Sequence, residues 1–144
     1  KAAIEEGIVP GGGAALLYAR EAITDTKSNL GSDMYIGKQI VYKACSSPFM
    51  KILTNAGYSE GDCYGLINDL KTFSSDHWHG YNIKTETFED MKQSGIIDPS
   101  KVTRNALENA ASIAGTVLLT EAAVVEIKDK NNSNNEMGAM PGMY

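Results

Sequence analysis

Residues 79 to 101 constrain the fold more than any other part of the sequence, because they join an extended hairpin to the start of a long helix. Tyr81 and Phe88 place one aromatic side chain on each arm of the predicted hairpin. A glycine turn follows, and Asp98-Pro99 is typical of a helix start: aspartate suits the N-cap, and proline suits the first helical position. The carboxylate of Asp98 has a second interpretation, as a group that holds hydroxyls of a ligand, but the local pattern favours the cap.

The segment from Pro99 to about Thr120 is predicted to be one helix, because its apolar residues recur along one face. That stripe consists of Val102, Ala106, Ala110, Ile113, Ala114 and Val117. Alanines together with Gly115 let neighbouring helices approach closely, so we expect this helix at the centre of a bundle.

Apolar periodicity predicts further helices upstream of the hairpin. They cover residues 14–23, 34–46, 47–56 and 59–70. For the helix over residues 47–56, Ser47 is expected to be the N-cap and Pro48 the first helical residue, and Gly57 is expected to end the helix. The next helix is predicted to turn Cys63, Leu66, Ile67 and Leu70 inward. The predicted fold class is therefore mainly α: a helical bundle with a small β hairpin and a C-terminal strand.

That C-terminal strand is predicted at Ala122–Lys128, where β-branched residues become frequent. A lone strand needs a partner, which is either the Tyr81 hairpin, a segment upstream of this sequence, or another subunit. Residues 129–144 are first rich in asparagine and then in glycine and methionine, so we expect them to be disordered. The predicted organisation is one domain over residues 1–128 and a tail over residues 129–144.

Composition and charge exclude several classes of function. The net charge of −5 and the lack of a Lys/Arg cluster argue against a nucleic-acid or membrane-surface partner. Cys45 and Cys63 form neither a zinc pattern nor a disulfide framework and are expected to be buried free thiols in a reducing compartment. His77 and His79 lack further ligands, so no metal site is predicted there.

The sequence lacks an initiating methionine, and Lys1–Gly7 is typical of the last turns of a helix, so we expect it to be part of a longer protein.

A triple-glycine loop, Gly11 to Gly13, runs directly into the predicted helix over residues 14–23. Glycines let a ligand approach the backbone closely, and a helix N-terminus offers free N–H groups to an anion. The spacing matches neither the P-loop nor the dinucleotide fingerprint, because Leu16 stands where the third glycine of that fingerprint would be. Taken alone, the glycines more often indicate a tight turn or close helix packing.

Several motifs in a fixed order carry a resemblance to a known family. They are Glu5–Gly13, Asn55–Gly57, Gly80–Asn82, Gly95–Arg104, Ala110–Ala114, Thr120-Glu121 and the Gly-Met tail. In this order they resemble the C-terminal portion of a group I chaperonin, the GroEL-type folding machine of bacteria, mitochondria and plastids. The resemblance covers nearly the whole sequence and implies a GroEL-type equatorial domain, of which this chain would be the second half.

The resemblance implies specific nucleotide contacts. Gly12 would contact nucleotide through its backbone, Asn82, Ile83 and Lys84 would lie beside the base, and Asp98 would hold the ribose hydroxyls. Ile83 and Lys84 depart from the two alanines that are usual in the family. The phosphate-binding loop, the magnesium ligand and the catalytic aspartate would lie upstream, so this chain alone is expected to hold no catalytic residue and no metal ligand and to be inactive. ATP or ADP with Mg²⁺ would be the cofactors of the whole protein.

For the whole protein, the resemblance implies an ATP-hydrolysing heat-shock chaperone that folds and refolds proteins in stacked seven-membered rings. Its partners would be identical subunits, a GroES-type co-chaperonin and unfolded polypeptides. The sequence Met137–Met143, followed by an aromatic end, is closer to mitochondrial than to bacterial tails and implies the mitochondrial matrix, with bacterial cytoplasm and plastid as alternatives.

Two other functions compete with this interpretation. A free-standing nucleotide-binding enzyme would use the Gly11–Gly13 loop, but no Lys-Ser/Thr pair follows the glycines and no catalytic dyad is evident. A helical interaction module without nucleotide binding would dock a partner on an alanine-rich face, and the unpaired strand near Val124 is its main support.

Overall fold

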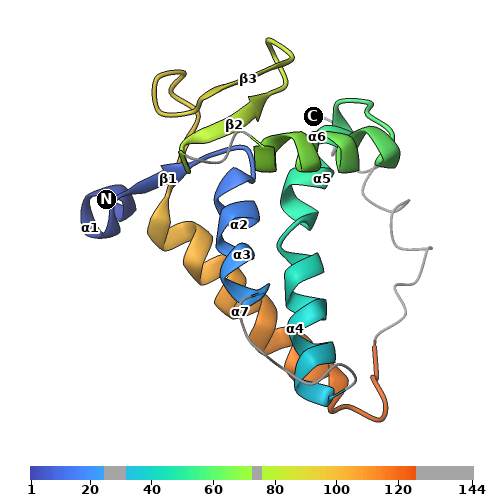
Figure 1. Ribbon diagram of the computed structural model, residues 1–144. Coiled ribbons are helices and arrows are strands. Elements are labelled where there is room, and N and C mark those ends of the chain that lie inside the picture. Colours follow the sequence, from blue (N-terminus) through green and yellow to red (C-terminus); the bar gives the residue numbers. More distant parts are fainter. Residues whose placement is uncertain (25–31, 73–75, 126–144) are drawn as a thin grey trace, which may run out of the picture. The chain divides into compact units, whose positions relative to one another are not determined.

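The structure, a computed structural model, describes residues 1–24, 32–72 and 76–125 (Figure 1). The chain divides into two compact units, Lys1–Ala110 and Ala111–Tyr144. The predicted disordered tail over residues 129–144 lies outside the described residues. None of the described helices combines the length and the apolar character that crossing a membrane requires.

Helices make up most of the described chain, with four short strands between them. The elements are α1 (Ala2–Glu6), β1 (Ile8–Pro10), α2 (Ala14–Ala19), α3 (Glu21–Thr24), α4 (Asp33–Ala44), α5 (Ser47–Asn55), α6 (Glu60–Thr72), β2 (His79–Asn82), β3 (Thr87–Asp90), β4 (Ile97–Pro99) and α7 (Ser100–Leu118). The strands form two antiparallel pairs, β1 with β4 and β2 with β3. The predicted mainly helical fold class with a small hairpin is confirmed.

The helix predicted over residues 14–23 is present as two helices, α2 and α3, which meet at Arg20. The backbone of Arg20 keeps right-handed helical angles, φ −63° and ψ −26°. Its side chain is buried, donates a hydrogen bond from Nη1 to Oγ of Ser46, and lies 4.7 Å from the centroid of the Tyr42 ring. This buried guanidinium was not predicted from the sequence; it connects the α2–α3 junction to the region between α4 and α5.

Helices α4, α5 and α6 occur where apolar periodicity places them. Helix α5 begins one residue earlier than predicted, because Ser46 occupies the N-cap position. The hydroxyl of Ser46 accepts from Arg20 and makes no bond to the helix backbone. At the start of α6, Ser59 Oγ accepts from the Asp62 N–H at 3.2 Å while Asp62 Oδ2 accepts from the Ser59 N–H at 3.2 Å. This reciprocal pair is a capping box and accounts for the helix start.

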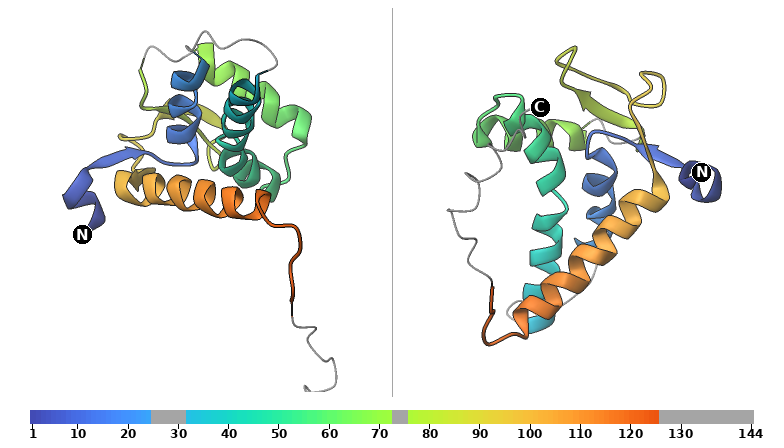
Figure 2. Two further views of the ribbon diagram at one scale, coloured as in Figure 1. Left: turned by 90° about the horizontal axis from the view of Figure 1, so that it is seen from below. Right: turned by 180° about the vertical axis from the view of Figure 1, so that it is seen from behind.

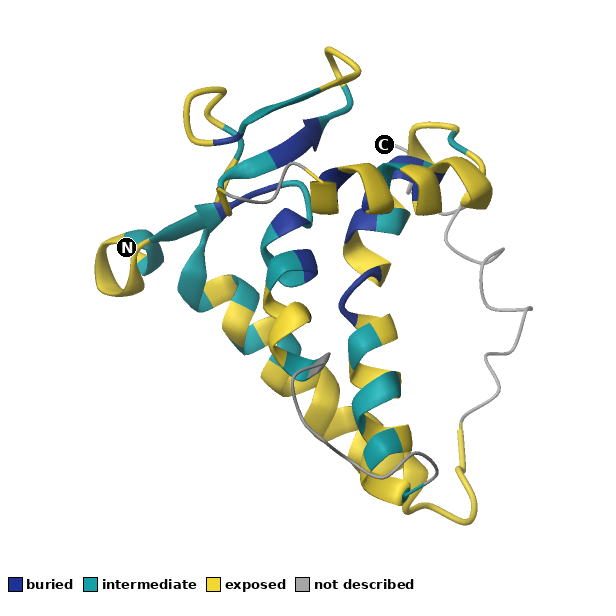
Figure 3. Ribbon diagram, viewed as in Figure 1, coloured by how far each residue is buried: buried dark blue, intermediate teal, exposed yellow. Residues whose placement is uncertain are grey.

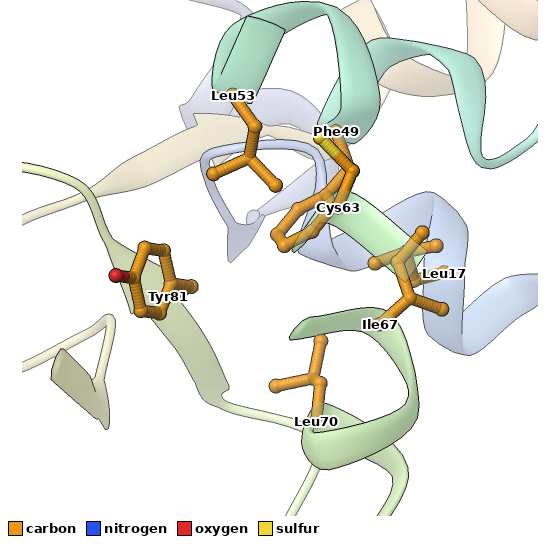
Figure 4. Close-up of a cluster of buried hydrophobic side chains, with 7 residues drawn as sticks. All are labelled: Leu17, Phe49, Leu53, Cys63, Ile67, Leu70 and Tyr81. Carbon is orange, nitrogen blue, oxygen red and sulfur yellow. The ribbon is translucent and has the colours of Figure 1, made fainter. Parts of the chain in front are cut away.

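The hydrophobic core of the first unit lies where α2, α5, α6 and β2 meet (Figures 3 and 4). It consists of Leu17, Phe49, Leu53, Cys63, Ile67, Leu70 and Tyr81. Of the inward positions predicted for α6, Cys63, Ile67 and Leu70 are buried, and Leu66 is partly buried and packs against the core. Cys45 and Cys63 are both buried free cysteines, as predicted.

The predicted hairpin is formed by β2 and β3, with Tyr81 directly opposite Phe88. The rings of these two residues meet edge to face, with centroids 5.1 Å apart. Both rings contribute to the core or pack against it. His79 begins β2, so one of the two histidines lies in a strand.

Strands β1 and β4 pair although about 90 positions separate them in the sequence. In Figure 2 the blue start of the chain lies beside the gold segment that leads into α7. In this register Val9 is opposite Asp98 and Pro10 is opposite Ile97. The Ser100 N–H donates to the Gly7 carbonyl at 3.1 Å, and the Gly11 N–H donates to the carbonyl of Ile96 at 2.9 Å, so hydrogen bonds continue on both sides of the strand pair.

This pairing corrects the predicted start of the long helix. Helix α7 begins at Ser100, and Asp98 and Pro99 belong to β4. Asp98 is therefore not the N-cap, because its backbone is extended beside Val9. The N–H of Ser100 finds its acceptor in the carbonyl of Gly7 without help from a side chain.

The length of α7 is as predicted, but its expected burial is not found among the described residues. No residue of α7 is buried, and the side chains of Ile113 and Val117 are 65% and 63% exposed. An apolar stripe becomes the centre of a bundle only where other elements pack against it. The described part of the chain supplies no helix or strand that buries the apolar stripe of α7.

The strand predicted at Ala122–Lys128 is not formed over residues 122–125, and residues 126–128 lie outside the described part. Val124 and Val125 are exposed. β-Branched composition favours a strand only when a partner satisfies its backbone groups. Neither of the two strand pairs of the described chain includes these residues.

Candidate functional site

A pocket of about 190 Å³ opens in the first unit between the glycine loop, α5 and the end of the hairpin. Its lining residues are Gly12, Phe49, Ile52, Leu53, Tyr81, Asn82, Ile83, Lys84, Met91 and Ile96. Gly12, Asn82, Ile83 and Lys84 are four of the five residues that the sequence analysis selected. The structure thus brings together residues from two segments about 70 positions apart in the chain.

The glycine loop has the left-handed backbone that glycine adopts without strain, with φ of 65° at Gly12 and 82° at Gly13. A Cβ atom on Gly13 would lie 2.7 Å from the backbone nitrogen of Phe49, so the loop runs against the start of α5. A Cβ on Gly12 would lie 3.2 Å from Cε of Met91. Close packing therefore accounts for Gly13, while Gly12 faces Met91 and the pocket.

Two hydrogen bonds orient the amide of Asn82 at the end of β2. Its Oδ1 accepts from the Lys84 N–H at 3.0 Å, which is an Asx turn that begins the hairpin loop. Its Nδ2 donates to Oε1 of Glu89 on β3. A side-chain amide has two N–H groups and two oxygen lone pairs, so with respect to the described residues one of each remains for a ligand.

Tyr81 connects the hairpin to the core behind the pocket. Its hydroxyl lies 3.0 Å from the hydroxyl of Tyr58, and the two rings meet edge to face with centroids 6.1 Å apart. The hydrogen bond with Tyr58, together with burial, raises the pKa of Tyr81 to about 12 from its ordinary value of 10.0. The folded protein therefore favours the neutral phenol.

This pKa predicts a loss of stability at alkaline pH. A phenol with a higher pKa in the folded than in the unfolded state stabilises the fold below about pH 10 and loses that contribution as the pH rises to about 12. We expect Tyr81→Phe to reduce the alkaline loss of unfolding free energy by on the order of 2 kcal/mol, measured by urea titrations at several pH values. Tyr64→Phe is the control, because Tyr64 is exposed. If the free energy of unfolding of Tyr81→Phe depended on pH as that of the wild type does, the raised pKa of Tyr81 would be contradicted.

Asp98, the fifth residue selected from sequence, is exposed in β4 and does not line the pocket. It follows Ile96, which does line it, by two positions. Asp98 is therefore close to the pocket along the chain, but it is not one of the lining residues.

Met91, Ile96 and Glu89 are among the residues that shape the pocket or its rim but were not selected from sequence. Met91 is buried beneath Gly80, where a Cβ would lie 2.6 Å from its Cγ, and Ile96 lies against Gly11. Glu89 holds Asn82. Glu89 could have been found from the sequence if the strand register had been known. In a hairpin that pairs Tyr81 with Phe88, Glu89 and Asn82 are diagonal neighbours on the same face.

The chemistry of the pocket suits binding. Most lining side chains are apolar or aromatic, with one amide at Asn82 and one ammonium group at Lys84. Among the described residues that line it there is no carboxylate, histidine or cysteine. Three or more potential metal ligands do not come together anywhere in the described ranges. The arrangement can hold a flat group with a polar edge, and its lining offers no acid–base pair.

Comparisons with known proteins agree on one family. The model of the TCP-1/cpn60 chaperonin family matches residues 1–128. Among solved structures, the crystal structure of a group III chaperonin in the open state is 29% identical in sequence, with a TM-score of 0.74. The match covers 85% of this chain and 25% of that chain, so this chain spans about a quarter of the length of the chaperonin that it matches.

Proposed function

The chain belongs to the TCP-1/cpn60 chaperonin family, and we propose that it forms the second half of the equatorial, nucleotide-binding domain of a group I chaperonin. The match to one quarter of a longer chaperonin chain supports the assignment to a part of such a protein. That solved structure is a group III chaperonin. The proposal of group I rests on the ordered sequence motifs, from Glu5–Gly13 to Gly95–Arg104 and the Gly-Met tail.

One observation carries the nucleotide-binding part of this proposal: Gly12, Asn82, Ile83 and Lys84, chosen from sequence, line one pocket. Apolar walls suit the faces of a base, and the free N–H and lone pair of Asn82 suit its polar edge. Ligand pockets usually measure about 300–1,000 Å³, so a pocket of about 190 Å³ suits a base better than a whole nucleotide. The ribose would extend toward Asp98 and the phosphates would lie beyond the described pocket.

The activity and partners of the whole protein are part of the same proposal. It would hydrolyse ATP with Mg²⁺, assemble with identical subunits in stacked seven-membered rings, and fold polypeptides with a GroES-type co-chaperonin, in the mitochondrial matrix. The exposed apolar residues of α4, and separately those of α7, support the proposal that other parts of the assembly cover each of these helices. They include Met34, Ile36, Ile40, Val102, Ile113 and Val117.

Asp98→Asn tests the proposed ribose contact. We expect ATP binding by the full-length protein to weaken ten- to a hundredfold, about 1.5–3 kcal/mol, because asparagine lacks the charge and one of the two acceptor oxygens. Thermal stability should not change, because Asp98 lies in β4 and caps no helix. Isothermal titration calorimetry measures the affinity.

Asp69→Asn is the matched control, because it removes a carboxylate from the exposed face of α6. Wild-type ATP affinity in Asp98→Asn would contradict the ribose assignment. A helical interaction module without nucleotide binding is the second candidate, favoured by the exposure of Ile113 and Val117. It predicts that the wild-type protein also binds no ATP in the same titration.

A further inference from the structure

We propose that Glu89 is a positioning residue: it fixes the Asn82 amide so that the pocket selects a purine with an amino group at position 6. This inference rests on the proposed nucleotide site. In the β2–β3 register Asn82 is opposite Thr87 and Gly80 is opposite Glu89. Asn82 and Glu89 are therefore diagonal neighbours on one face of the hairpin, and the hydrogen bond from Nδ2 to Oε1 joins them directly.

The two bonds of Asn82 permit one orientation of its amide. Oδ1 faces the N–H of Lys84, and Nδ2 faces the carboxylate of Glu89. A flipped amide would direct Nδ2 at the N–H of Lys84 and Oδ1 at a carboxylate, so both contacts would become repulsive. The bond to Glu89 has an ionised acceptor, which makes it stronger than a bond between neutral groups. Without Glu89, only the contact with Lys84 would oppose the flip.

A fixed amide distinguishes bases by the pattern of donors and acceptors on their edges. Adenine carries an amino donor at position 6, and an asparagine oxygen accepts from such a group. Hypoxanthine carries a carbonyl acceptor at the same position, which the Asn82 oxygen would repel and only the flipped amide would satisfy. Glu89 does not line the pocket, so it acts through Asn82 and not on the base.

The experiment compares ATP with inosine triphosphate, whose base is hypoxanthine, as ligands of the full-length protein in calorimetric titrations. We expect Glu89→Ala to weaken ATP binding about three- to tenfold and to leave inosine triphosphate binding unchanged. The preference for ATP should therefore fall about three- to tenfold. Glu89→Gln should restore it only in part, because the glutamine oxygen accepts the same hydrogen bond but lacks the charge, and its amide group can also donate to a flipped Asn82.

Two further variants separate positioning from other effects. In an Asn82→Ala background, Glu89→Ala should cause no further loss of ATP affinity, because the group through which it acts is gone. Glu86→Gln removes a carboxylate from the loop of the same hairpin and should leave the base preference unchanged. Thermal unfolding of each variant measures any general weakening of the hairpin, which would not alter the ratio of the two affinities.

The outcomes distinguish this inference from the proposed function. If Asn82→Ala binds ATP as the wild type does, the proposed base site is wrong. If Asn82→Ala weakens ATP binding but Glu89→Ala keeps the wild-type preference, the positioning role alone is wrong. An equal loss from Glu89→Ala in the wild-type and Asn82→Ala backgrounds would also overturn that role.

Discussion

Replacing Phe49 with alanine is expected to lower the free energy of unfolding by about 3–5 kcal/mol. The side chain is 2% exposed and belongs to the core cluster, beside residues from α2, α6 and β2 (Figure 4). Its removal deletes a large buried ring and leaves a cavity that the surrounding backbone fills only in part. The backbone nitrogen of Phe49 also lies against Gly13, so collapse into the cavity would disturb the glycine loop.

Ile52→Ala is the matched control for this prediction. Ile52 lies three residues further along α5 and lines the same pocket, but its side chain is 41% exposed. Its replacement should cost about 1–2 kcal/mol, because part of the side chain is already in contact with water. Urea denaturation followed by circular dichroism measures both values. Equal losses in the two variants would show that Phe49 is not a core anchor.

Gly13→Ala is expected to destabilise the protein by about 2–5 kcal/mol. Its φ of 82° is left-handed, which costs an alanine about 1–2 kcal/mol. The new Cβ would also lie 2.7 Å and 2.8 Å from the backbone nitrogen and Cα of Phe49. Because those atoms belong to the backbone, α5 or the loop has to shift, and such overpacking costs about 1–3 kcal/mol more.

The same substitution should have the opposite sign at Gly37, in the interior of α4. A Cβ there meets no atom within 4 Å outside the helix itself. Alanine stabilises a helix interior by about 1 kcal/mol relative to glycine, so Gly37→Ala should raise the free energy of unfolding. The midpoints of thermal unfolding should therefore move in opposite directions for the two variants. An unchanged free energy of unfolding in Gly13→Ala would contradict the close approach of the loop to α5.

Local periodicity was sufficient to predict the helices and much of the core. Cys63, Ile67 and Leu70 recur at the spacing of one helical face, and that face is buried as predicted. The hairpin could be predicted equally well from the sequence, because Tyr81 and Phe88 alternate with polar neighbours on either side of a short loop. These features depend on residues close together in the sequence.

Features that depend on distant partners were not predictable in this way. Asp98-Pro99 fits a helix start when considered alone, but pairing with Val9 places it in a strand. The apolar stripe of α7 has the same local pattern whether or not another element covers it. Arg20 is polar and would be expected at the surface, yet Ser46 and Tyr42 hold it in the interior.

The residues of the candidate site also fall into two groups, those selected from the sequence and those that only the structure revealed. Gly12 and the segment from Asn82 to Lys84 were selected by resemblance to a family, and the structure brings them to one pocket. Met91 and Ile96, which also line that pocket, were not selected, because they have no local feature that distinguishes them from other apolar residues. Glu89 required knowledge of the strand register, which fixes diagonal neighbours.

The pairing of β1 with β4 has a consequence for synthesis of the chain. About 90 positions separate the paired residues, and a ribosome adds about 5–20 residues per second, so β1 emerges roughly 4–18 s before its partner exists. During that interval it is an unpaired strand, of the kind that recruits other chains. Its length of three residues and the missing N–H of Pro10 leave few groups for such pairing. The nascent segment is thereby protected while it waits.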